Sequence, residues 1–467
     1  MKNTYCVNPL KSASRREFLR SAATLSAAGA AAPFALNLAG IGAAAAQSAT
    51  DYKALVCVFL TGANDHNNTV IPYDTASYNT YLAARPLLAR SVADLQVLTP
   101  SVALTGTNAG RQFSLPKELA PLKTLWDASK LAILANVGPL IVPTTKIQYE
   151  AGSVALPPKL FSHNDQQSVW QASAPEGATY GWGGRIGDLY AAQNTNSIFT
   201  CSSVSGSAVF LAGRTIGAYQ VGVTGSVAIT GLTGNLFGSS TAAASLKTII
   251  TSGGTHLLSQ DHAATTLRSI DADKILSAAL ATVSDFTVPA ELATSTLAGQ
   301  LRIVSRMLAA RNTLGQKRQI FFVTLGGFDT HDSQLTEQPA LHTQLAAALS
   351  VFNANIESLG LSNQVTTFTA SDFGRTLAAN ADGSDHGWGS HHFIMGSAVQ
   401  GKRYYGTFPI MGIGNSDEVG SGRLLPTTSV DQYAATLATW FGVSSTDMKL
   451  VLPNIGNFAL SDLGFMV

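Results

Sequence analysis

Short apolar runs that open into glycine and polar side chains constrain the fold of this chain more than any other feature. Residues 319–331 read Q-I-F-F-V-T-L-G-G-F-D-T-H, so a mainly apolar run is followed by two glycines, Asp329 and His331. The run is too short to span a membrane, and its composition is that of a strand buried on both faces. Such a strand predicts a helix-covered parallel sheet with Asp329 and His331 at its carboxyl end, where open α/β sheets bind ligands.

Several other segments repeat this plan. Apolar runs at 53–60 and 131–137 are followed by Gly62 with five polar residues and by Gly138, and a further expected strand at 365–371, V-T-T-F-T-A-S, is followed by Asp372. Segments with helical spacing separate the runs, at 115–126, 265–311 and 342–359. This alternation of strands and helices predicts an α/β fold with a mostly parallel central sheet.

The N-terminal residues have the features of an export signal. Residues 14–19 read S-R-R-E-F-L, and an alanine-rich, moderately apolar stretch follows to Ala46. Adjacent arginines before an apolar stretch and a small-residue cleavage site are typical of a twin-arginine signal peptide over residues 1–46. The alternative, an N-terminal membrane anchor, is disfavoured by Pro33 and Asn37. We therefore expect cleavage near Gln47, a periplasmic or extracellular location and no stable membrane anchor.

Composition limits the remaining possibilities. The chain has 467 residues, 46% hydrophobic and 12% charged, which suits one large domain over 47–467. Without residues 1–46, 24 basic residues face 27 acidic ones, so the charge gives no reason to expect nucleic-acid binding. Three cysteines make a disulfide framework unexpected. Residues 195–255, rich in Ser, Thr and Gly, predict an irregular or β-rich insertion that caps the sheet.

Carboxylates and imidazoles gather at the predicted strand ends and in one glycine-rich loop. The loop, residues 383–393, reads G-S-D-H-G-W-G-S-H-H-F. Oxygen and imidazole ligands suit Zn, Mn or Fe, or Ca and Mg where histidines are fewer, and two adjacent metals can clamp an in-line displacement. A structural alternative is that His391 and His392 are core or turn residues and that Asp65 belongs to a turn rich in Asn and Asp. The candidate metal ligands are Asp65, Asp329, His331, Asp372, Asp385, His386 and His391.

Two further residues are catalytic candidates. Ser162 precedes a predicted helix with Asp165 in its first turn, so it is either an N-cap or a hydroxyl placed where a helix start favours an anion. Arg185 lies in a second predicted helix start, G-W-G-G-R-I-G, and faces either the site or solvent. A Ser-His-Asp hydrolase is disfavoured because V-S-G-S-A near Ser205 lacks the strand-to-helix context of a nucleophile elbow.

The ordered motifs resemble those of the domain-of-unknown-function family 1501. They are the leader, G-A-N-D-H-N-N-T-V-I-P-Y, L-A-P-L-K-T-L-W, F-S-H-N-D-Q-Q-S-V-W-Q, G-G-F-D-T-H, S-D-F-G-R-T, S-D-H-G-W-G-S-H-H-F and S-V-D-Q-Y-A-A-T-L-A-T-W-F-G. Members look like twin-arginine-exported relatives of the alkaline phosphatase and sulfatase superfamily. The resemblance implies a three-layer α/β/α sandwich and a metal-dependent hydrolase of small or polymeric anionic phosphate or sulfate esters, using one or two divalent ions (Zn, Mn or Ca) and exported by the twin-arginine translocase.

Individual residues match the superfamily pattern to different degrees. It implies that Asp65 bridges the metals, that Ser162 is the nucleophile, and that Asp329 and His331 bind one metal. Asp372 is followed by Phe373 where the superfamily has Asp-His, so a ligand is missing there. Asp385-His386 or His391 either takes its place or matches the superfamily's late histidine. Asp431 resembles a structural acid at the start of the closing helix. These departures leave an alternative open: a non-catalytic, secreted metal- or glycan-binding or assembly protein with a degenerate site.

Overall fold

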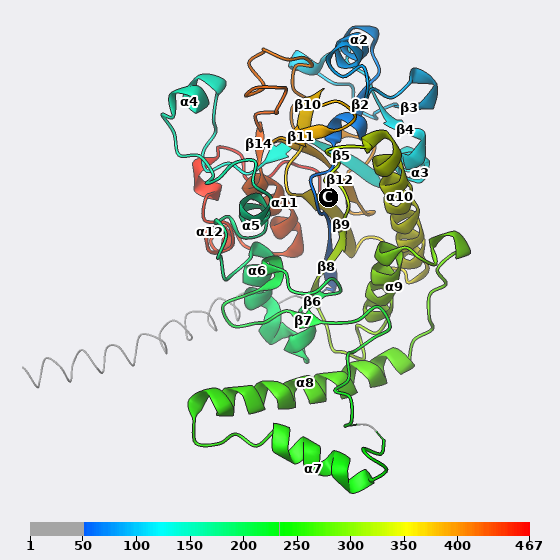
Figure 1. Cartoon of the computed structure of the whole chain (residues 1–467), viewed down its shortest axis with the longest axis vertical. Coiled ribbons are helices and arrows are strands. Elements are labelled where there is room, and N and C mark those ends of the chain that lie inside the picture. The colour runs from blue at the N-terminus through cyan, green and yellow to red at the C-terminus, as the bar shows by residue number, and fades with distance from the viewer. Residues whose placement is uncertain (1–50, 233) are drawn as a thin grey trace, which may run out of the picture. The chain divides into compact units, whose positions relative to one another are not determined.

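A mostly parallel sheet forms the centre of the protein (Figure 1). The computed structural model describes residues 51–232 and 234–467, so the predicted signal peptide lies outside the described residues. The sheet has the order β13-β5-β12-β9-β1-β8-β6-β7, with β14 beside β5, and only β12 runs antiparallel to its neighbours. Its strands are β1 (Lys53–Leu60), β5 (Leu131–Gly138), β6 (Cys201–Ser203), β7 (Tyr219–Gln220), β8 (Arg318–Leu325), β9 (Val365–Ser371), β12 (Ser390–Met395), β13 (Tyr404–Tyr405) and β14 (Thr428–Ser429).

Helices cover both faces of this sheet. In β1, Val56 and Val58 belong to a core shared with one helix layer, whereas Leu55 and Phe59 belong to a core shared with the other. Successive strand side chains point to opposite faces, so a continuous apolar run supplies both cores. The first layer contains α3 (Ala120–Asp127), α9 (Thr296–Ala309) and α10 (Gln334–Ser358), and the second contains α5 (His163–Ala172), α6 (Trp182–Tyr190) and α11 (Val430–Phe441). The predicted three-layer α/β/α architecture is confirmed.

Smaller elements surround the sandwich. A three-stranded sheet of β2 (Ile71–Pro72), β4 (Phe113–Pro116) and β3 (Leu95–Leu98) and a hairpin of β10 (Arg375–Ala379) and β11 (Ser384–His386) lie outside the main sheet. Helices α7 (Ser240–Ile250) and α8 (Leu257–Ala281) project away from it (Figure 1). The remaining helices are α2 (Thr75–Ala84), α4 (Lys146–Ala151) and α12 (Met448–Val451). None of the helices in these described residues has the length and apolar content to cross a bilayer.

Two predictions about local structure were wrong, whereas the helical pattern over 265–311 corresponds to the two helices α8 and α9. The helix expected from residue 115 begins at Ala120, because residues 113–116 pair with β3 as a strand. The segment 383–393, expected as a loop, contains β11 and most of β12. Strand β10 pairs with β11, and β5 and β9 pair with β12, and the local sequence does not reveal these hydrogen-bond partners.

The segment 195–255 contributes both sheet and helix. Strands β6 and β7 extend the main sheet beyond β8, and α7 follows them. Cys201 on β6 and Cys57 on β1 are both buried free thiols.

Strand register brings the carboxyl ends of the three central strands to the same level. Leu60 at the end of β1 lies opposite Leu325 of β8 and Ser371 of β9. The loops that leave these strands therefore start side by side, as expected at the ligand-binding edge of an α/β sheet.

Candidate metal centre

The loops at the strand ends approach one another closely because one of them carries glycine. Gly62 follows β1 with φ +107°, and a Cβ atom there would lie 2.5 Å from the backbone nitrogen of Asp329. Only a residue without a side chain fits this contact and this backbone conformation. Arg375, which is fully buried, ties the same loops together by donating to the carbonyls of Gly62, Ala63 and Ser384 and to the Asp329 carboxylate.

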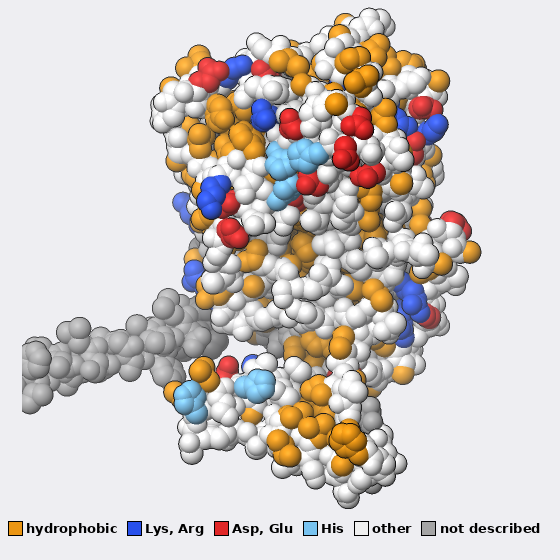
Figure 2. Space-filling view, viewed as in Figure 1, with side chains coloured by type: hydrophobic (Ala, Val, Ile, Leu, Met, Phe, Trp, Pro, Cys, Tyr) orange, Lys and Arg blue, Asp and Glu red, His pale blue; other side chains and the backbone are white. Residues whose placement is uncertain are grey.

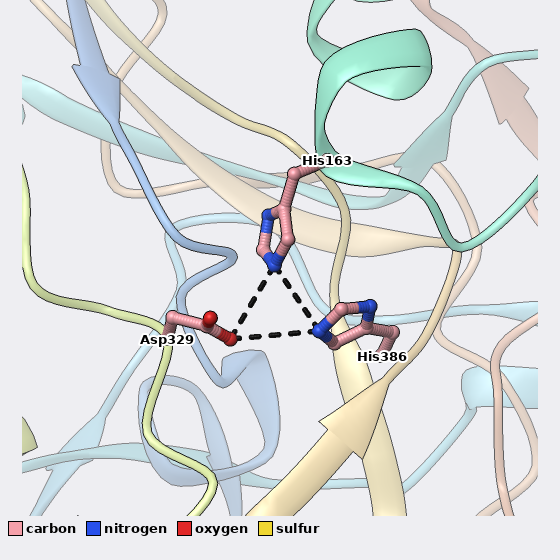
Figure 3. A group of neighbouring side chains, drawn as sticks. All are labelled: His163, Asp329 and His386. Carbon is pink, nitrogen blue, oxygen red and sulfur yellow. Dashed lines mark hydrogen bonds and ion pairs between the residues drawn. The ribbon is translucent and has the colours of Figure 1, made fainter.

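Three side chains from distant parts of the sequence converge at this point (Figure 3). The Nε2 atoms of His163 and His386 are 3.1 Å apart, and they lie 3.4 and 3.5 Å, respectively, from Oδ1 of Asp329. His163 begins α5, Asp329 follows β8 and His386 ends β11. One face of the molecule accordingly shows histidine side chains gathered among acidic ones (Figure 2).

A fourth side chain, that of His331, lies at the edge of this group. Its Nε2 is 2.9 Å from Nε2 of His386 and 3.1 Å from Oδ1 of Asp329. His331 is exposed, whereas His163 and His386 are half-buried. The cluster thus presents three imidazole nitrogens and one carboxylate oxygen, and it is open to solvent on the His331 side.

Each imidazole uses its other nitrogen for a contact outside the cluster. Nδ1 of His163 lies 2.5 Å from Oδ2 of Asp372, and Nδ1 of His386 lies 2.7 Å from the carbonyl oxygen of Phe161. Nδ1 of His331 is 3.5 Å from Oδ1 of Asp385. An acceptor at Nδ1 places the proton there and leaves the Nε2 lone pair for a ligand, which is the usual arrangement around metal-binding histidines.

The surroundings shift the pKa values of these groups in directions that suit their contacts. The hydrogen bond to Asp372 raises the pKa of His163, which outweighs the opposing effect of partial burial. Burial lowers the pKa of His386 and so favours its neutral form. Partial burial acts to raise the pKa of Asp329, but the hydrogen bond and charge of Arg375 outweigh it, and the net pKa is below its ordinary value.

The donor set fits a divalent metal ion. Zinc–nitrogen bonds of about 2.0–2.1 Å at the tetrahedral angle place neighbouring donor atoms about 3.4 Å apart, and the His163, His386 and Asp329 donors are 3.1–3.5 Å apart. Two imidazole lone pairs at such a distance repel each other unless a cation or a proton lies between them. The spacing, the free lone pairs and the carboxylate all favour a bound cation.

The structure places Asp65 away from this cluster, in a buried ion pair. Its Oδ2 accepts hydrogen bonds from Arg85 at 2.7 Å and from Gln334 at 2.6 Å, and its Oδ1 accepts from the backbone N–H of Asn67 at 3.0 Å. Both Asp65 and Arg85 side chains are inaccessible to solvent. The two carboxylate oxygens of Asp65 are therefore already engaged in holding α2, α10 and the loop after β1 together.

Asp372 and Asp385 lie in an outer layer around the cluster. Besides contacting His163, Oδ2 of Asp372 accepts from Gln167 at 3.0 Å and from the backbone N–H of Gly62 at 3.2 Å. Its Oδ1 is buried and has no hydrogen-bond partner among the described residues. These contacts hold the Asp372 carboxylate against His163, whereas Asp385 lies 3.5 Å from His331 and accepts a hydrogen bond from Asn380.

His391 is buried on β12, where its Nδ1 accepts the backbone N–H of Asn136 at 3.0 Å. Its ring packs against that of His66 with 5.0 Å between centroids. Burial lowers the pKa of both rings, and that of neighbouring His392 as well, to about 3 for His66 and His392. These neutral imidazoles belong to the interior between β12 and the first loop.

The two catalytic candidates occupy different surroundings. Ser162 is the N-cap residue of α5 by position, but its hydroxyl makes no capping bond and instead donates to Oδ2 of Asp165 at 3.1 Å. Arg185 donates to the carbonyl oxygens of Val451, Ala172 and Tyr180, each at 3.0 Å, and so joins α6 to its neighbours.

Comparison with known proteins assigns the family. Residues 52–450 match the sequence model described as "Protein of unknown function (DUF1501)". The chain belongs to this family. No protein of curated function matches the DUF1501 chain in sequence.

Solved structures give weaker likenesses. The lipoteichoic acid synthase LtaP from Listeria monocytogenes is 11% identical at a TM-score of 0.35, over 88% of this chain and 77% of that one. Ps i-CgsB in complex with k-i-k-neocarrahexaose is 8% identical at a TM-score of 0.35, and the match covers 87% of this chain and 77% of that one. A mutant of the alkaline phosphatase PafA is 11% identical at a TM-score of 0.29, and the match covers 70% of this chain and 64% of that one. Scores this low carry no weight in assigning an activity to the DUF1501 chain.

His163 is the member of the cluster that sequence reasoning missed. It lies in the F-S-H-N-D motif directly after Ser162, where the pattern of a helix start gives the serine a role and the histidine none. The sequence does contain a signal for His163. This histidine follows a predicted helix start, and the chain has two Asp/His pairs, Asp329 with His331 and Asp385 with His386, near predicted strand ends or glycine turns.

Proposed function

We propose that this DUF1501 protein is an exported, zinc-dependent hydrolase of phosphate or sulfate esters. The observation that carries the proposal is the convergence of His163, His386 and Asp329 on one point, with both imidazole lone pairs turned inward. Three imidazoles, counting His331, favour zinc over calcium, which takes oxygen ligands. A zinc ion there would supply Lewis acidity and lower the pKa of a water molecule that it binds.

The residues around the cluster would keep its donors in place. Asp372 holds His163 with Nε2 inward, and the Phe161 carbonyl does the same for His386. Arg375 fixes the Asp329 carboxylate and is itself anchored on three backbone carbonyls. Such outer contacts commonly change metal affinity by about 10–100-fold.

Ser162 is the proposed nucleophile, with Asp165 as the acceptor of its proton. The 3.1 Å hydrogen bond between them has the length expected of a nucleophile and its base. The Ser162 oxygen would bond to phosphorus or sulfur as the bond to the ester oxygen breaks, and the proton taken up by Asp165 would pass to the departing alcohol. A water molecule would then attack phosphorus or sulfur, the bond to the serine oxygen would break, and a proton from that water would restore the serine as the inorganic acid leaves.

Arg423 is placed to recognise an anionic ester. Its Nε donates to the carbonyl oxygen of His386 at 2.8 Å, and its guanidinium carbon lies 5.2 Å from the ring centre of Phe161. Its Nη2 makes no hydrogen bond to the described residues, which leaves a donor for a phosphate or sulfate oxygen.

The proposal includes export by the twin-arginine translocase and action in the periplasm or outside the cell. Its motivation is the S-R-R-E-F-L segment and the alanine-rich stretch after it. Replacing Arg15 and Arg16 by lysine should retain the precursor in the cytoplasm, and cell fractionation tests this. Export of the doubly substituted protein at the normal level would contradict it.

A metal and activity assay tests the enzyme. Mature protein purified from the exported fraction should contain zinc by mass spectrometry and should lose it in Asp329→Ala and His386→Ala. Zinc-loaded protein should hydrolyse at least one aryl phosphate or sulfate, and Ser162→Ala should abolish turnover while zinc content stays unchanged. Full turnover in Ser162→Ala would exclude the serine as nucleophile. Bound zinc without hydrolysis of any ester would favour a metal-binding protein that is not an enzyme.

A further inference from the structure

We infer that a groove beside the metal centre binds a neutral, polyhydroxylated group, a sugar residue, so that the ester is carried on a carbohydrate. The groove has a volume of about 370 Å³, within the roughly 300–1,000 Å³ of small-molecule sites. The carbohydrate part of the inference concerns binding alone. Only the statement that this sugar carries the hydrolysed ester rests on the proposed function.

The groove is continuous with the residues around the cluster. Gln167 lines it and also donates to the Asp372 carboxylate that holds His163. Asn164, the residue after His163, and Thr61, the residue before Gly62, line it too. A ligand in the groove therefore lies against the same helix start and the same strand end that build the metal centre.

The lining side chains have hydrogen-bonding groups that the protein does not use. Among the described residues, the side chains of Thr61, Asn164 and Thr324 make no hydrogen bond, and neither does the buried hydroxyl of Ser205. Gln171 uses its oxygen to accept from the Phe210 N–H, but its NH₂ group is not used. Thr61 and Thr324 are half-buried and the Ser205 hydroxyl is buried, whereas Asn164 is exposed at the edge of the groove. Polar groups with this degree of burial normally have partners, so these unpaired donors and acceptors point to a ligand rich in hydroxyl groups.

The charge of the groove favours a neutral ligand. None of the described residues that line it is Lys, Arg or His, and Glu176, which is exposed, is its only acid. A polyanion would meet repulsion here without a compensating cation, whereas a carboxylate accepts hydrogen bonds well from sugar hydroxyls. The apolar floor, formed by Phe59 and Phe322, suits the C–H faces of a sugar ring.

A direct binding measurement tests the groove without depending on catalysis. Full-length mature protein in EDTA is titrated with labelled hexasaccharides of glucose, mannose, galactose and N-acetylglucosamine. We expect one of them to bind, and Asn164→Ala and Thr324→Val each to weaken it about tenfold, as loss of one or two hydrogen bonds would. Asn363→Ala is the matched control, because Asn363 is an exposed asparagine at the opposite end of the sheet, before β9, and its side chain makes no hydrogen bond to any described residue.

The outcomes of this titration separate sugar binding by the groove from ester hydrolysis by the metal centre. Binding that Asn164→Ala and Thr324→Val weaken, with Asn363→Ala unchanged, supports the inference even if no ester is hydrolysed, in which case only the proposed function fails. No binding of any hexasaccharide, or equal binding by all three variants, overturns it. If esters are hydrolysed, the two groove variants should raise KM for a sugar phosphate or sulfate and leave KM for p-nitrophenyl phosphate or sulfate unchanged. Equal effects on both kinds of ester would also contradict the groove's role.

Discussion

Nδ1 of His163 and Oδ2 of Asp372 lie 2.5 Å apart, although the residues are 209 positions apart in the sequence. The carboxylate fixes the ring so that Nε2 faces His386 and Asp329 (Figure 3). Asp372 therefore acts on the cluster through the histidine that it orients. Asp372 at the end of β9 is thus paired with a histidine from another element, α5.

Asp372→Asn should weaken zinc binding about 10–100-fold, because an amide orients His163 less firmly and no longer increases its basicity. Competition with a chelating dye measures the affinity, and a thermal melt checks folding. Asp332→Asn is the control, since Asp332 is exposed and makes no side-chain hydrogen bond among the described residues. Equal affinities in both variants would show that Asp372 does not position a metal ligand.

Asp65→Ala should lower the free energy of unfolding by about 3–5 kcal/mol, because it leaves the charge of Arg85 buried without a partner. Zinc content should stay at the wild-type level, unlike that of Asp329→Ala. Urea titration and metal analysis on the same preparations separate the two roles. A loss of zinc with little change in stability would instead make Asp65 a metal ligand, as the family resemblance implied.

Zinc should stabilise the folded protein by about 2.7 kcal/mol when the free ion is at 100 times its Kd. The stabilisation should disappear in His386→Ala, which removes an inward lone pair. Thermal melts with and without zinc after EDTA treatment measure the effect. If His386→Ala gains as much stability from zinc as the wild type, the ion binds elsewhere.

Asp431→Asn should change how stability depends on pH. Burial raises the pKa of Asp431 from 3.8 to about 6, which outweighs hydrogen bonds from the backbone of Asn454 and from Ser173. Between pH 4 and pH 6 the folded state holds a proton that the unfolded state has lost, so stability falls as pH rises through this range and then levels. Asparagine does not titrate, so the variant lacks this loss. Above pH 6 its free energy of unfolding should exceed that of the wild type by up to about 3 kcal/mol.

Urea titrations from pH 4 to pH 7.5 in EDTA test this prediction for Asp431. The difference between variant and wild type is the quantity to follow, since other titrating groups cancel in it. The difference should be small at pH 4 and greatest above pH 6. A constant difference across the range would show that Asp431 titrates alike in the folded and unfolded states.

Several central strands and their alternation with helices can be predicted from the chain alone. Buried strands need apolar side chains, and the largely apolar segments at 53–60, 131–138 and 318–325 are visible without a structure, as is the Thr-rich strand segment at 365–371. Of the acids that follow these segments, Asp329 and Asp372 both contact His163, whereas Asp65 pairs with Arg85. The strand β12 was not visible, because its His-His pair becomes favourable only between β5 and β9.

Which carboxylates and imidazoles meet depends on the folded arrangement. Asp65 and Asp329 follow neighbouring strands in similar motifs, yet Arg85 and Gln334 engage Asp65 whereas Arg375 turns Asp329 toward His163. Side-chain direction at a strand end depends on partners that lie from 20 to 269 residues away in the sequence, and local sequence does not encode them. The sequence could name the residue types of a metal site, but the contacts that aim each ligand exist only in the folded protein.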